Sequence, residues 1–178
     1  MKGGKNLANS IVSAIDDIVN FPVAYAHCDI PCGIYDPHTA QMAAHTVIRM
    51  VKLINDATAA APKETPTPAQ RQEFVSKIQR YTAVKEQHAE LVKHEVRVLW
   101  GDYFKPEHAK ANPGLHDLVW KTLKDASKAR QEVSMDTAKE LLKDTEQIAE
   151  IFWKTKSVET KRVKSFYPSE EEIVYPKV

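Results

Sequence analysis

Glycine is scarce in this sequence, with five residues among 178. That scarcity argues against the glycine-rich loops that hold phosphates or dinucleotides. An excess of one charge is also missing, because 25 Lys and Arg residues face 24 Asp and Glu residues for a net charge of +1. No basic run with interleaved aromatic residues is present either. We therefore expect no nucleic-acid partner.

Long apolar runs are absent too. No segment approaches the roughly 20 uninterrupted apolar residues that a membrane-spanning helix requires, so we expect no membrane-integral segment. The composition of 43% hydrophobic and 28% charged residues is typical of a soluble globular protein. The length suits one ordinary domain.

The alternating apolar pattern of β-strands is also missing, and helical spacing takes its place. Starts at Asp36-Pro37 and Thr67-Pro68 combine a capping side chain with proline in the first turn. We predict an all-α fold, an up-and-down four-helix bundle over residues 37–156. Its helices are expected at about 37–60, 68–103, 114–133 and 135–156.

The apolar stripes predict which residues face the core. The first helix is expected to bury Met50 or Val51, and the last to bury Leu141, Leu142, Thr145, Ile148 and Phe152. Ala43 shares a stripe with Val47 and Ile54, and His88 shares one with Val84 and Leu91. Both Ala43 and His88 are therefore expected to face inward. Glu150 and Lys154 are spaced as an i,i+4 ion pair.

Two terminal segments flank the bundle. Residues 1–26 form an amphipathic leader with apolar residues at helical spacing, which breaks at "NFPVAYA". Residues 157–178 are a C-terminal extension of unknown role that mixes charged and aromatic residues. That extension is expected to be either an arm that packs on a neighbouring molecule or a loose end.

Both cysteines of the chain, Cys28 and Cys32, lie in the segment "AYAHCDIPCGIYDP". A bridge between them would close too small a loop to stabilise the fold strongly. Half-buried thiols or an incidental disulfide remain open on spacing alone. Zinc is less suitable, because a closed zinc site needs four nitrogen or sulfur ligands and no second closely spaced pair is present.

Cleavage of the leader after Ala26 would change the chemistry of this segment. It would create a free α-amine on His27, next to the amide nitrogen and thiolate of Cys28. With the Cys32 thiolate these donors can form a nearly planar N2S2 set, which suits Ni(II) or Cu(II). The His27 imidazole is placed to bind axially.

The segment from His27 to Pro37 resembles the nickel hook of the nickel superoxide dismutases. The resemblance continues in "VKEQHAELVKHEVRVLWGDYFKPEH" at residues 84–108, in Leu115-His116 and in "IFWKTK" at residues 151–156. It covers the chain from residue 27 to about residue 156. The hook, residues 27–36, is the most specific part.

The resemblance implies an oxidoreductase that disproportionates superoxide to dioxygen and hydrogen peroxide by Ni(II)/Ni(III) cycling, with one nickel ion per subunit. By the same resemblance, His27, Cys28 and Cys32 are the metal ligands. Tyr35 is expected to limit access to the open axial face. The residues expected around the centre are Tyr103, His88, Asp29 and Pro31, the last in a cis peptide bond. A homohexamer and a processing protease are the implied partners.

Several of these residues also have a purely structural interpretation. Tyr35 and Tyr103 can be packing residues, because tyrosine is often partly buried. The family supports the axial imidazole with a glutamate and an arginine, whereas this chain has Ala43 and His88 at the matching positions. We expect a neutral His88 to hold the His27 imidazole, directly or through a water. The alternative is an ordinary core histidine.

Two other functions remain open. One is a helical nickel-binding or nickel-delivery protein without turnover, and the other is a thiol redox switch. Either would keep the leader, because an acylated His27 nitrogen cannot act as an amine ligand. We expect a cytoplasmic protein. Export is the alternative, since Lys2, Lys5 and Ala24-Tyr25-Ala26 mimic a secretory signal although Asp16 and Asp17 interrupt its apolar region.

Overall fold

The structure is a computed structural model of the whole chain, and it describes residues 14–15, 19, 33–62 and 64–177. Residues 1–32 and 33–178 are separate compact units, and the second is described here. Most of the predicted leader and all of the predicted ligands lie outside the described residues. This applies to His27, Cys28, Asp29, Pro31 and Cys32.

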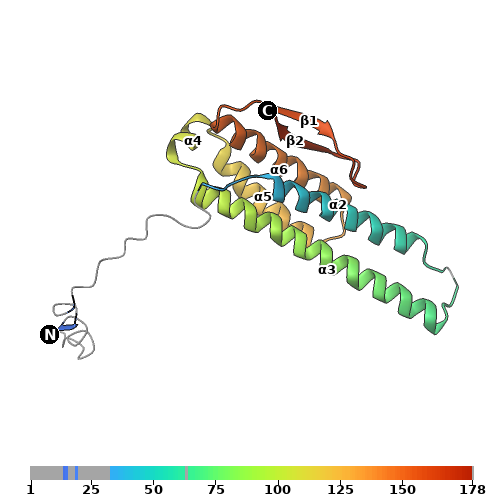
Figure 1. Cartoon of the computed structure of the whole chain (residues 1–178). Helices are drawn as coiled ribbons and strands as arrows, with labels where there is room; N and C mark the ends of the chain where they lie inside the picture. Colours follow the sequence, from blue (N-terminus) through green and yellow to red (C-terminus); the bar gives the residue numbers. More distant parts are fainter. Residues whose placement is uncertain (1–13, 16–18, 20–32, 63, 178) are drawn as a thin grey trace. The chain divides into compact units, whose positions relative to one another are not determined.

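Four long helices form the predicted bundle. They are α2 (His38–Ala59), α3 (Pro68–Val98), α5 (Leu115–Gln131) and α6 (Met135–Thr155). Figure 1 shows α2 and α3 as an antiparallel pair whose connecting end extends beyond α5 and α6. The predicted four-helix architecture is confirmed, and each predicted helix boundary lies within a few residues of the observed one.

The start of α3 uses the capping chemistry expected from the sequence, whereas in α2 the N-cap is Pro37 rather than Asp36. Thr67 accepts a hydrogen bond from the Gln70 backbone N–H at 3.3 Å, and the Gln70 side chain accepts from the Thr67 N–H at 2.9 Å. This reciprocal pair is a capping box. At the start of α2, the Asp36 carboxylate accepts from the His38 N–H at 2.7 Å.

The core lies between the four helices. The stripe predicted for α6 is buried in full, and α2 buries Val51 rather than Met50. In α3 the prediction was wrong in detail, because the fully buried face carries Lys85, Ala89, Val92 and Val96. His88 is only half-buried. The first half of α3 extends beyond α5 and α6 (Figure 1), and none of residues 68–80 is fully buried.

Two short elements interrupt the segment between α3 and α5. Residues Leu99–Tyr103 form a π-helical turn, closed by the Phe104 N–H donating to the Leu99 carbonyl at 2.9 Å. Helix α4 (Pro106–Ala111) follows, between two of the predicted helices and in a segment where no helix was predicted. Proline in its first turn starts this helix rather than preventing it.

The C-terminal extension contains two strands, which the all-α prediction did not include. Strands β1 (Thr160–Lys164) and β2 (Glu172–Pro176) pair antiparallel, with Arg162 opposite Val174. Ile173 and Val174 are buried. The expectation of a loose end is therefore wrong, because the extension folds as a hairpin against the bundle of its own chain (Figure 1). Packing of this extension on a neighbouring molecule stays a prediction. We call residues 158–177 the C-terminal hairpin.

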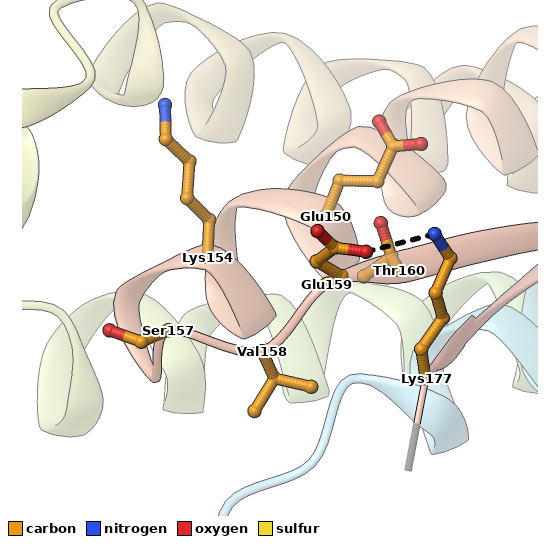
Figure 2. A pocket seen from close by; sticks show the side chains of 7 residues that line it. All are labelled: Glu150, Lys154, Ser157, Val158, Glu159, Thr160 and Lys177. Carbon is orange, nitrogen blue, oxygen red and sulfur yellow. Dashed lines mark hydrogen bonds and ion pairs between the residues drawn. The ribbon is translucent and has the colours of Figure 1, made fainter.

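Ion pairs join the C-terminal hairpin to α6. Arg162 donates to Glu146 at 2.6 Å and to Glu150 at 2.7 Å. The predicted Glu150–Lys154 pair is not formed, because Glu150 turns to Arg162 while Lys154 lies 3.5 Å from Asn112. Figure 2 shows the Glu150 and Lys154 side chains pointing apart, in a pocket of about 550 Å³ that the Glu159–Lys177 ion pair helps to line.

Candidate metal centre

The candidate centre is built around the residues that follow the predicted hook. Tyr35 is half-buried and packs against the hydrophobic core just before α2. Its ring centroid lies 5.6 Å from that of Tyr103, with the rings tilted by 54°. The structure therefore brings together the two tyrosines that sequence reasoning placed near the open face of the metal.

Tyr103 lies at the centre of an aromatic cluster. Its ring lies 4.5 Å from Phe152, 5.3 Å from Phe104 and 5.6 Å from His108, on which it stacks. Together with Tyr35 these residues form what we call the aromatic cluster. It joins the end of α3, α4 and α6, so the position of Tyr103 is fixed by three helices.

The hydroxyl of Tyr103 is also fixed. It lies 2.5 Å from the Thr155 hydroxyl, which in turn donates to the Phe152 carbonyl at 2.7 Å. Because a threonine hydroxyl has a single proton, the Tyr103 hydroxyl must donate to Thr155. Its proton is therefore engaged in a structural hydrogen bond, and Tyr103 contributes a rigid wall rather than a proton donor.

A positive charge lies beside the aromatic cluster. The Lys156 ammonium group is 5.2 Å from the centroid of Tyr103 and 5.1 Å from that of Phe152, within the range of cation–π contacts. Sequence reasoning missed Lys156, Phe152, Thr155 and His108 as parts of the site. Only the spacing of Phe152, Thr155 and Lys156 at the end of a helix could have grouped three of them on one face.

The structure fixes the tautomer of His88. Its Nδ1 lies 2.8 Å from the Val84 carbonyl of the preceding helical turn. Because a carbonyl only accepts, Nδ1 carries the proton, and in the neutral ring Nε2 is left as an acceptor. Ala43 is buried, with 2% of its surface exposed. These facts are compatible with the predicted support for an imidazole, although that imidazole lies outside the described residues.

Within the described residues, no group of three or more His, Cys, Asp and Glu side chains could hold a metal ion. Among those same residues, no helix has both the length and the apolar character to cross a membrane. The predicted ligands lie before residue 33, outside the described residues. If the leader is cleaved after Ala26, the amine, amide and two thiolates of residues 27–32 would form a square-planar donor set that suits nickel, with the His27 imidazole as a further donor.

Comparison with known proteins shows similarity over both the predicted hook and the bundle. Residues 22–156 match the family model described as nickel-containing superoxide dismutase. A curated relative, "Superoxide dismutase [Ni]" of Streptomyces coelicolor, is 43% identical over 131 residues, which are 74% of this chain and 88% of the relative. The protein of the same name from Streptomyces seoulensis is 41% identical over the same shares.

Solved structures give the same result. A native nickel superoxide dismutase structure is 40% identical with a TM-score of 0.58, and the match covers 73% of this chain and 99% of that one. A structure with nickel ligation corresponding to the oxidized state is 38% identical with a TM-score of 0.59, covering 74% and 99%. The family match ends at residue 156, so the C-terminal hairpin lies outside it. The chain belongs to the nickel-containing superoxide dismutase family.

Proposed function

We propose that this chain is a superoxide dismutase, which converts two superoxide anions and two protons to one dioxygen and one hydrogen peroxide. The observation that carries the proposal is the sequence His27-Cys28-x-x-x-Cys32 within the family match, followed by Tyr35 against Tyr103. Nickel bound there supplies the one-electron chemistry by alternating between Ni(II) and Ni(III). One nickel ion per subunit is expected.

The residues of the chain have separate tasks in this proposal. His27, Cys28 and Cys32 bind the metal, and thiolate donation lowers the potential at which it is oxidised. Tyr35 and the rigid Tyr103 ring restrict the approach to small molecules. The Lys156 ammonium group adds a positive potential next to the aromatic cluster, which attracts the superoxide anion.

The direct test removes one thiolate at a time in processed protein. Intact mass should show loss of residues 1–26, and metal analysis should show one nickel per chain. Cys28→Ser and Cys32→Ser should each lose nickel and dismutase activity while the helical circular dichroism remains. An active, nickel-loaded chain that still carries the leader would refute the proposal, and so would full activity in either serine variant.

The role of His88 has its own test. If Nε2 of neutral His88 accepts a hydrogen bond from the His27 imidazole, His88→Ala should lower activity without removing nickel. The axial nitrogen signature of Ni(III) in electron paramagnetic resonance should weaken. His94→Ala is the matched control, because His94 is exposed on the same helix. A His88→Ala spectrum identical to that of wild type would make His88 an ordinary structural residue.

Assembly and location are also proposals. We propose a homohexamer and release of the leader by a protease, both supported by the resemblance of the hook and bundle to the family. Analytical ultracentrifugation of the processed protein should give six chains per particle. We propose a cytoplasmic location. Fractionation of cells that make the natural protein tests it against export.

A further inference from the structure

The C-terminal hairpin is fastened to the bundle along its whole length. At its turn, the Ser169 hydroxyl pairs with Nδ1 of buried His45 at 2.8 Å, and Glu171 forms an ion pair with Lys139 at 2.7 Å. Further along, the buried Gln41 side chain accepts from the Val174 N–H at 2.8 Å and donates to the Val174 carbonyl at 3.1 Å. The hairpin is therefore a fixed part of the fold.

The other end of the C-terminal hairpin reaches the first turn of α2. The Tyr175 ring lies 5.8 Å from the ring of His38, with an interplanar angle of 32°. Beside this contact is a cavity of about 280 Å³, whose walls include Asp36, His38, Trp153 and Tyr175. Residues separated by more than 130 positions in the sequence thus form one wall at the start of α2.

This wall includes Asp36, the last residue of the predicted hook. The Asp36 carboxylate accepts from the His38 N–H in the first turn of α2, and Asp36 directly follows Tyr35. The turn at residues 36–38 thus connects Tyr35 to α2. A displacement of His38 would shift this turn and, with it, the position of Tyr35 against Tyr103.

We propose that Tyr175 is a positioning residue for the nickel hook, because its ring holds His38 and thereby the turn at residues 36–38. The proposal rests on the proposed function, since it presumes a metal bound by residues 27–32. By this proposal the C-terminal hairpin, which lies outside the family match, has a role in metal binding. Tyr175 does not touch the reacting atoms, so its effect is on metal binding and on the order of the hook.

The main experiment compares Tyr175→Ala with Ser169→Ala in the processed, full-length protein. Ser169→Ala is the matched control, because it weakens the same hairpin at the end far from the hook. Nickel affinity is measured by competition with a chelator, and hydrogen exchange of the metal-free protein is followed at residues 33–38. Tyr175→Phe tests for rescue, since it keeps the ring that contacts His38.

Tyr175→Ala should speed exchange at residues 33–38 and weaken nickel binding by about 3- to 10-fold. That effect is smaller than the roughly 10- to 100-fold loss caused by removing a direct partner of a metal ligand. Tyr175→Phe should restore both values. Ser169→Ala should lower the melting temperature while leaving nickel affinity and exchange at residues 33–38 unchanged.

Two results would overturn the inference alone. One is wild-type exchange and nickel affinity in Tyr175→Ala, and the other is an equal loss in Ser169→Ala, which would indicate general destabilisation. Wild-type protein that binds no nickel after processing would instead overturn the proposed function, and this inference with it. Cys28→Ser, measured in the same chelator assay, sets the value expected for a broken hook.

Discussion

Two interfaces of the bundle bury different polar side chains, one between α3 and α5 and the other between α2 and the C-terminal hairpin. Between α3 and α5 the buried group is the ammonium of Lys85, which has 1% of its surface exposed. Between α2 and the C-terminal hairpin the buried groups are the neutral amide of Gln41 and the ring of His45, with 1% and 3% exposed. The interface between α3 and α5 therefore encloses a charged side chain, whereas the interface between α2 and the C-terminal hairpin encloses neutral ones.

The difference follows from the backbone groups that need a hydrogen-bond partner at each interface. Lys85 donates to the carbonyls of Ala129 at 2.5 Å and Arg130 at 2.8 Å, in the last turn of α5. Those carbonyls have no partner within the helix, and the negative end of the helix dipole favours a cation there. Strand β2 instead presents both an N–H and a carbonyl at Val174, which an amide can match but an ammonium cannot. The two carbonyls of α5 thus suit the lysine ammonium group, and the N–H and carbonyl of Val174 suit the glutamine amide.

The largest effect is expected from removing the charged group. Lys85→Ala leaves the buried Ala129 carbonyl and the partly buried Arg130 carbonyl without their donor and opens a cavity, so we expect a loss of about 3 kcal/mol in the free energy of unfolding. Lys85→Met keeps most of the volume and should cost less. Lys93→Ala, which removes a partly exposed lysine from the same interface, should cost under about 1 kcal/mol. Urea unfolding measures the free energy of unfolding of all three variants. Equal losses in Lys85→Ala and Lys93→Ala would show that the buried ammonium group has no special role at this interface.

A smaller loss is expected on the neutral side. Gln41→Leu leaves the N–H and carbonyl of Val174 without their partners, and an unpaired buried group costs about 1 to 3 kcal/mol. Gln41→Glu keeps the acceptor but sets a carboxylate oxygen against the Val174 carbonyl, so it should not rescue stability. Urea unfolding, together with hydrogen exchange at Val174, checks this. Unchanged exchange at Val174 would show that the amide is not the partner that holds β2.

The smallest effect is a dependence of stability on pH. Burial lowers the pKa of His45 below its usual 6.5, while the Glu172 backbone and the Glu171 carboxylate oppose that shift and His38 adds to it. The unfolded chain then binds the proton more readily. Stability is thus fully present above about pH 6.5 and is lost as the pH falls through the folded pKa, by at most about 1.4 kcal/mol per pH unit.

His45→Gln should flatten this dependence, because glutamine does not titrate. His94→Gln is the control, since His94 is exposed on α3. The unfolding midpoint in urea, measured between about pH 5 and pH 8, gives the slope for each variant. A wild-type slope that survives in His45→Gln would assign the pH dependence to another group.

The sequence predicted the parts of the molecule that depend on local chemistry. Capping at Thr67, the apolar stripe of α6 and the four-helix bundle follow from spacing within single helices, and all are observed. The position of Tyr35 beside Tyr103 was expected from the resemblance to the family. The ligands His27, Cys28 and Cys32 and the neighbours Asp29 and Pro31 remain predictions.

What the sequence did not predict depends on contacts between distant segments. Strands β1 and β2 are five residues each, and only Ile173 and Val174 are fully buried on them, so no alternating pattern was visible. The hairpin is held by groups from α2 and α6. Lys85 looked like a surface lysine because only the end of α5 supplies its carbonyl partners.

The π-helical turn at Leu99–Tyr103 affects where this chain can tolerate the loss of a residue. In an α-helix each residue advances by about 100° and 1.5 Å. Deleting one residue within Leu99–Tyr103 would close the turn to α-helical width and leave the residues after it at nearly the same angle. The same deletion within the regular part of α3 would instead rotate Tyr103 by about 100° relative to Phe152. A gap in α3 should therefore displace the wall that faces Tyr35 far more than a gap in the wide turn or in the loop at residues 60–67.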